Sequence, residues 1–128
     1  MRAMGAMALV LALMAPCVAQ AEPDAQDLVV VAGPEGSLAA KALTSGNFEA
    51  ARRRLEPMPV YGENDPARLI NLGNAYAGLG RMDQARQAYR AARFAPEIVL
   101  VLANGDEQSS RAVATRALGR LNPAYAMR

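Results

Sequence analysis

Residues 69–89 read LINLGNAYAGLGRMDQARQAY, and this stretch decides the fold. Apolar and small residues recur in it at helical spacing on both sides of Gly80. Glycine readily adopts the left-handed conformation that ends a helix, so the first helix should stop there. The second helix should run from Met82 to about Phe94, because Pro96 cannot continue it. The stretch therefore predicts two helices joined by a tight turn.

A similar pattern occurs 34 positions earlier in the chain. The matched pairs are Leu38 with Leu72, Ala39 with Gly73, Gly46 with Gly80, Phe48 with Met82, Ala51 with Ala85, and Leu55 with Tyr89. This period and pattern resemble the tetratricopeptide repeat family. The positions that carry the resemblance are Leu38, Gly46, Phe48, Ala51, Leu55, Leu69, Leu72, Gly73, Tyr76, Gly80, Ala85, Tyr89 and Ala92. The resemblance implies a mostly α fold, a short α-solenoid of two helical hairpins.

Small residues in the second copy have a physical role. Gly73 and Ala85 should lie where the two antiparallel helices cross, because small residues let the backbones approach closely. Leu69, Tyr76 and Tyr89 then fill the space around that contact.

The first copy is weaker than the second. Ala42 stands where the family pattern has Tyr, and residues 33–36 contain two glycines and a proline. We therefore expect its first helix to begin only at Ser37 and its second to span Phe48 to about Pro57.

Two further helix starts can be read from capping residues. Asp65 followed by Pro66 is a capping side chain and then a residue suited to the first helical position. Ser109 or Ser110 can cap an amphipathic helix over residues 111–121. Since each repeat must bury its apolar face on a neighbour, this last helix should cover the second repeat.

Residues 28–32 and 98–103 are apolar runs that look like short strands, and Asn104-Gly105 after the second run is a hairpin signal. Two interpretations stay open. In the first, the hairpin positions the last helix; in the second, the two runs pair with each other or offer an edge to a partner strand.

The N-terminus has the features of a signal peptide: Arg2, an apolar stretch over residues 4–14, and the cleavage pattern Ala19-Gln20-Ala21. Cys17 suggests a lipoprotein, but Pro16 does not fit the cleavage box of that class. We expect cleavage near Ala21 and an exported bacterial protein, periplasmic or secreted. The apolar stretch is too short to span a bilayer, so no membrane span is expected in the mature chain.

These observations predict six segments. They are a signal peptide (1–21), an extended N-terminal segment (22–36), two repeats (37–97, divided into 37–64 and 65–97), a short strand or hairpin (98–108), a capping helix (109–122) and a tail (123–128).

No set of catalytic residues emerges from the sequence. The chain has no histidine, and after cleavage it would have no cysteine, so neither thiolate nor imidazole metal ligands would remain. The acidic pairs Glu63 with Asp65 and Asp106 with Glu107 lack the alternating oxygen ligands of a calcium loop and are better explained as capping residues. We expect no enzyme activity, no cofactor and no metal.

Charge limits the possible partners. The formal net charge is only +2, which argues against a nucleic-acid partner. Residues 22–49 hold one Lys and five acids, whereas residues 50–128 hold twelve Arg and seven acids. The acidic start is therefore expected to fold back on the basic body.

The resemblance implies a concave face lined by the first helix of each repeat. In the second repeat it would be lined by Ala67, Ile70, Asn71, Asn74 and Ala77. Asn71 and Asn74 could hydrogen-bond a peptide backbone, or they could simply be solvated.

A second candidate surface is basic. Arg86, Arg90 and Arg93 recur at helical spacing, and stacking could bring Arg52 beside them in a stripe that attracts an acidic partner. The alternative is a solvated outer face.

The leading hypothesis for function is a protein-protein interaction adaptor or scaffold that binds a peptide or protein of the cell envelope. The alternatives are a structural unit that self-associates, or a non-catalytic regulatory subunit of an envelope enzyme.

Overall fold

The computed structural model describes residues 26–31, 33–57 and 63–121, and the signal peptide, the first residues after it and the tail 123–128 lie outside the described residues. Within those ranges the chain forms five helices and one pair of strands. In chain order they are α1 (Gly33–Thr44), α2 (Phe48–Leu55), α3 (Pro66–Gly78), α4 (Met82–Phe94), β1 (Val99–Val101), β2 (Glu107–Ser109) and α5 (Ser110–Leu121).

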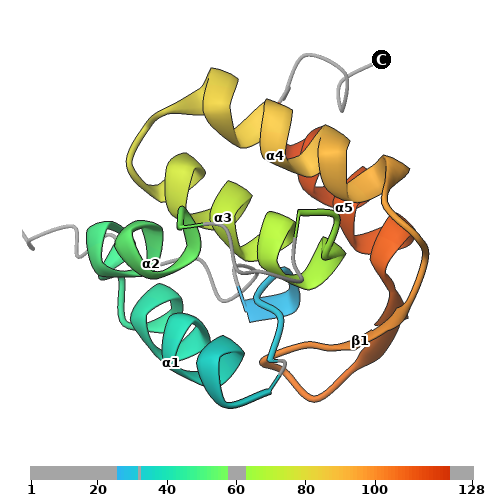
Figure 1. Ribbon diagram of the computed structural model, residues 1–128, viewed down its shortest axis with the longest axis horizontal. Helices are drawn as coiled ribbons and strands as arrows, with labels where there is room; N and C mark the ends of the chain where they lie inside the picture. The colour runs from blue at the N-terminus through green and yellow to red at the C-terminus, as the bar shows by residue number, and fades with distance from the viewer. Residues whose placement is uncertain (1–25, 32, 58–62, 122–128) are drawn as a thin grey trace, which may run out of the picture.

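Each helix packs on the next along the chain, and α3 lies at the centre with α2 and α4 on its two sides (Figure 1). The strands β1 and β2 form an antiparallel hairpin that leads from α4 into α5. The described part is therefore mostly helical with a small sheet, as the sequence predicted. In that part no helix is long and apolar enough to cross a membrane.

The predicted helix ends are confirmed by their local geometry. Asp65 caps α3 by accepting a hydrogen bond from the Ala67 N–H (3.0 Å), and Ser109 accepts one from the Ala112 N–H (3.1 Å) at the start of α5. Gly80 has a φ of 76° in the turn after α3. α4 has the predicted bounds, Met82–Phe94, and follows directly on this turn, with the acidic residue Asp83 in its first turn.

The start of the first helix differs from the prediction. α1 begins at Gly33, four residues before Ser37. Pro34 then falls in the first turn, where a missing N–H removes no intrahelical hydrogen bond. The prediction was wrong because it treated Pro34 as a helix breaker.

Most residues of the repeat pattern lie in the core. Those buried are Ala51, Leu55, Leu69, Leu72, Gly73, Tyr76, Ala85, Tyr89 and Ala92, whereas Phe48 is half-buried. Gly46, with a φ of 77°, ends the turn after α1 as Gly80 does after α3. The side chain of Leu38 lies outside the described residues.

Two glycines of α3 allow close packing against the neighbouring helices. A Cβ at Gly73 would lie 2.6 Å from Tyr89 Cδ1 on α4, and one at Gly78 would lie 2.5 Å from Phe48 Cε1 on α2. No side chain could be accommodated at either distance without movement of the ring. Gly73 therefore has the role that the sequence predicted, and Gly78 has the same role on the opposite side of α3.

The two apolar runs pair with each other as well as forming the hairpin. Val99 lies opposite Ser109 in the β1–β2 ladder. On the other side of β1, Val30 forms an antiparallel bridge with Leu102. The Val31 N–H donates to the Val101 oxygen (2.8 Å), which extends this pairing. Both interpretations of the runs are thus realised in one structure.

Candidate peptide-binding face

The residues expected on a concave face all lie on α3. Ala67, Ile70 and Asn71 are buried, and Asn74 and Ala77 are half-buried. The two asparagines hydrogen-bond the main chain of Leu28 and Val30 in the same chain. We call residues 27–31 the N-terminal segment, which runs across α3 beside β1 (Figure 1).

Asn71 binds the backbone of Val30 through both ends of its amide. The Val30 N–H donates to Asn71 Oδ1 (2.9 Å), and Asn71 Nδ2 donates to the Val30 oxygen (2.8 Å). Both residues are buried, so these bonds are shielded from water. The Asn71 amide thus forms with Val30 the pair of hydrogen bonds that a residue of a neighbouring β-strand would form.

Asn74 extends this contact by one further hydrogen bond. Its Nδ2 donates to the Leu28 oxygen (2.8 Å), while its Oδ1 accepts from the Tyr89 hydroxyl (2.6 Å). A tyrosine hydroxyl is protonated at neutral pH, and the burial of Tyr89 raises the pKa of its phenol further. α4 therefore orients the Asn74 amide toward the N-terminal segment.

Replacing Tyr89 by Phe tests this orientation. The Tyr89→Phe variant should lose about 1 kcal/mol in the free energy of unfolding, because one partly buried hydrogen bond is removed and Asn74 Oδ1 loses this donor. Urea denaturation measures the loss. The amide protons of Asn74 should also shift in NMR spectra, and an unchanged Asn74 signal would contradict the proposed role of the hydroxyl.

The opposite edge of the N-terminal segment is held by the hairpin. The Ala103 N–H donates to the Val29 oxygen (2.8 Å), beside the bond between Val31 and Val101. Leu28, Val29 and Val30 are buried. Their main chain therefore lies between two sets of groups. On one side are the side-chain amides of Asn71 and Asn74 on α3, and on the other is the backbone of residues 101–103.

Asp27 joins the segment to α5. Arg120 Nη1 donates to Asp27 Oδ1 (2.7 Å), and Arg116 Nη2 donates to the Asp27 main-chain oxygen (3.0 Å). The hydrogen bond from Arg120 is the main reason that the pKa of Asp27 falls below its usual value of 3.8. Asp27, one of the acids in residues 22–49, thus contacts two arginines of the basic part of the chain, in the direction that the charge distribution predicted.

The four arginines of the expected basic stripe have separate environments. Arg52 pairs with Glu49 and Glu56, and Arg86 pairs with Asp83. The guanidinium of Arg93 lies 5.3 Å from the ring centre of Phe94.

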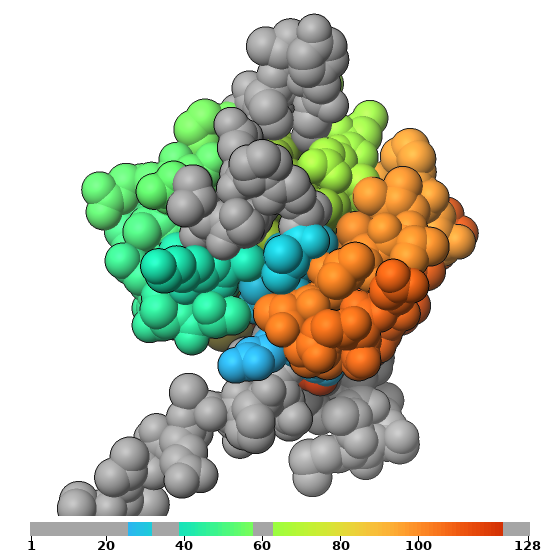
Figure 2. All heavy atoms as spheres, turned by 90° about the horizontal axis from the view of Figure 1, so that it is seen from below, coloured from blue at the N-terminus to red at the C-terminus, as the bar shows by residue number. Residues whose placement is uncertain are grey.

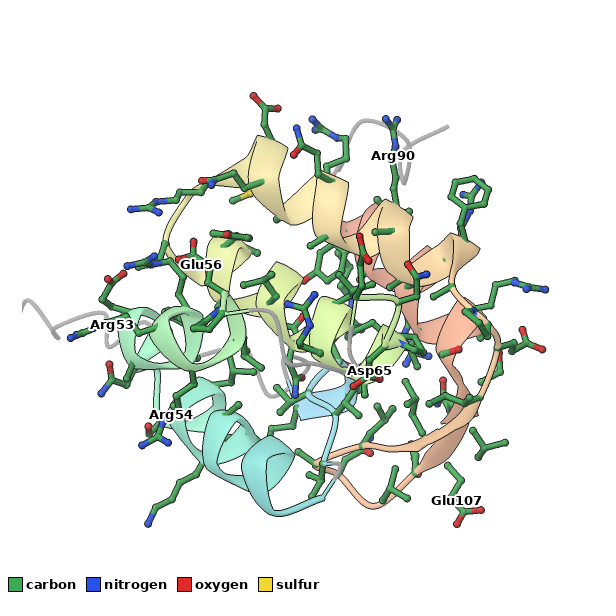
Figure 3. The ribbon with its side chains drawn as sticks, viewed as in Figure 1. Arg53, Arg54, Glu56, Asp65, Arg90 and Glu107 are labelled. Carbon is green, nitrogen blue, oxygen red and sulfur yellow. The ribbon has the colours of Figure 1, made fainter. Side chains whose placement is uncertain are left out.

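Arg90 is exposed and points away from α4, whereas Arg53 and Arg54 extend from α2 (Figure 3). The ion pairs of Arg52 and Arg86 with acids on the same helices offset part of the positive charge. This favours the interpretation of the surface as a solvated outer face.

The carboxylates also have structural roles. Asp65 caps α3, and Asp106 Oδ2 accepts from Asn104 Nδ2 (3.0 Å) within the hairpin turn. Among the described residues, no three His, Cys, Asp or Glu side chains are grouped so that they could hold a metal ion.

Comparisons with known proteins add nothing to this geometry. No family model matches the chain, and no curated protein or solved structure matches it. Any inference about function therefore rests on the chemistry of the α3 face.

Sequence reasoning identified Asn71 and Asn74 but not the segment that they bind. Tyr89 was expected only as a packing residue, and no role was predicted for Arg116 or Arg120. The two apolar runs and the uneven charge were the signals that could have joined these residues into one site.

Proposed function

We propose that this chain is an exported, tetratricopeptide-type adaptor that works in the periplasm and binds an extended segment of an envelope protein on α3. The period of 34 residues, the N-terminal signal pattern and the helix-on-helix packing support this proposal. The chain would act by binding, without catalysis.

One observation carries the proposal: the Asn71 amide hydrogen-bonds both main-chain groups of a single extended residue. Such recognition uses groups that every residue except proline offers, so it suits a polypeptide better than a small molecule. Asn74 adds a third main-chain contact, two residues away along the same segment. Side chains around the segment would then supply specificity.

Photocrosslinking from α3 tests the proposal. A photoreactive amino acid at Ala77, which is half-buried at the end of the face, should give a covalent adduct with an envelope polypeptide in intact cells. The same amino acid at Gln87, which is exposed on α4, is the matched control and should give none. Gel mobility and mass spectrometry detect the adduct. Equal adducts from both positions, or none from either, would contradict the proposed face.

A further inference from the structure

The N-terminal segment occupies the face on which the proposed partner would bind. Its main chain forms three hydrogen bonds with the side-chain amides of α3 and two with the backbone of residues 101–103. Asp27 adds a main-chain hydrogen bond from Arg116 and ion pairs with Arg116 and Arg120 of α5. The segment therefore shows what kind of ligand this face accepts.

Building on the proposed function, we propose that residues 27–31 are an exchangeable occupant of the α3 face. The partner supplies an extended peptide of the same chemical pattern, an acidic residue followed by three apolar residues. The requirements at each position follow from the contacts of the segment.

The first position favours a carboxylate. Asp27 forms a two-point contact with Arg120, since both carboxylate oxygens accept from its guanidinium. Arg116 Nε lies 3.5 Å from Asp27 Oδ2 and adds a second positive charge. These two arginines lie one turn apart on α5, so they favour an acidic side chain over a neutral one.

The next three positions require apolar residues, and the third of them is the most restricted. Leu28 is 8% exposed, Val29 4% and Val30 0%. Val30 is also the residue whose N–H and carbonyl both bind Asn71. Proline is therefore excluded there because it has no N–H, and a charged side chain is excluded by the cost of burial.

The last position is tolerant. Val31 is 39% exposed and uses only its N–H, which donates to the Val101 oxygen. Figure 2 shows that atoms of residues 26–31 reach the surface between α1 and the hairpin. An incoming peptide can thus begin to replace the segment at this exposed part.

Exchange is feasible because the contacts are equivalent in both states. A peptide of the same pattern would restore each hydrogen bond and the ion pair one for one. The apparent affinity is lowered only by the fraction of molecules whose own segment has left the face. A change that weakens the attached segment should therefore strengthen binding of a separate peptide.

The test uses the full chain and a fluorescent peptide with the sequence of residues 26–31, titrated by fluorescence anisotropy. The Asp27→Asn variant should bind this peptide about three- to tenfold more tightly than the unaltered chain, because its own segment has lost a partly exposed ion pair. Glu107→Gln is the matched control: it makes the same charge change at an exposed residue of β2 and should leave the affinity unchanged.

Two altered peptides test the pattern itself. A peptide with Asn in place of the acid should bind about three- to tenfold more weakly, because it lacks the ion pair with Arg120. A peptide with Pro at the position of Val30 should not bind measurably, because it lacks the N–H that Asn71 accepts.

Amide hydrogen exchange measured by NMR shows whether the peptide replaces the segment. With saturating peptide, the N–H groups of Val30 and Val31 should lose protection, since the chain's own segment has left. The Ala103 N–H should stay protected, because it then donates to the peptide.

Three results would overturn the inference. The peptide could fail to bind any variant, or it could bind while Val30 and Val31 stay protected. Asp27→Asn could also form a dimer in sedimentation experiments, which would make a second copy the occupant. An adduct from Ala77 combined with protected Val30 and Val31 would refute exchange and leave the adaptor proposal standing. Peptide exchange without any adduct would do the reverse.

Discussion

Replacing Asn71 by Leu should lower the free energy of unfolding by about 3 kcal/mol. Leucine has a similar size and a good helix propensity, so the change mainly removes the two hydrogen bonds to Val30. The N–H and carbonyl of Val30 would then be buried without partners, which costs about 1–3 kcal/mol for each group left unsatisfied. Urea denaturation followed by circular dichroism measures the loss.

Gln87→Leu on the exposed side of α4 is the control for this variant. It also replaces an amide by leucine in a helix, but no buried bond is lost, so the change should stay within about 0.5 kcal/mol. A loss below about 1 kcal/mol for Asn71→Leu would show that this amide is not what holds the N-terminal segment.

Replacing Gly73 by Ala should destabilise the protein by about 1–3 kcal/mol, although alanine is the better helix former. The added methyl group would overlap the Tyr89 ring, so either the ring or the α3–α4 contact must shift. A shift of Tyr89 also disturbs the hydrogen bond from its hydroxyl to Asn74. Thermal unfolding measures the loss, and weaker protection of the Leu28–Val31 amides would accompany it.

Gly119 provides the matched control for this substitution. It lies in α5 and has no atom within 4 Å of the position that a Cβ would occupy. Gly119→Ala should therefore stabilise the protein by up to about 1 kcal/mol through helix propensity alone. If both variants changed stability in the same direction and by the same amount, close packing at Gly73 would not be the reason.

Most of the helical framework could be predicted because its signals are local. Asp65 and Gly80 act on backbone groups within a few residues of themselves, so their effects can be predicted from the local sequence. The position of Gly73 against Tyr89 followed from the repeat, since a helical hairpin brings positions at that separation together. The start of α1 was wrong because Pro34 is compatible with both a loop and a first turn.

The candidate site was predictable only in part. The sequence alone determined that Asn71 and Asn74 share one face of a helix and that the acidic residue Asp27 precedes an apolar run. Only the tertiary structure decided that these two features meet, because Val30 and Asn71 are 41 positions apart and Asp27 and Arg120 are 93 apart. Contacts over such separations depend on which surfaces are left to bury after the helices have packed, and no local pattern of residues contains that information.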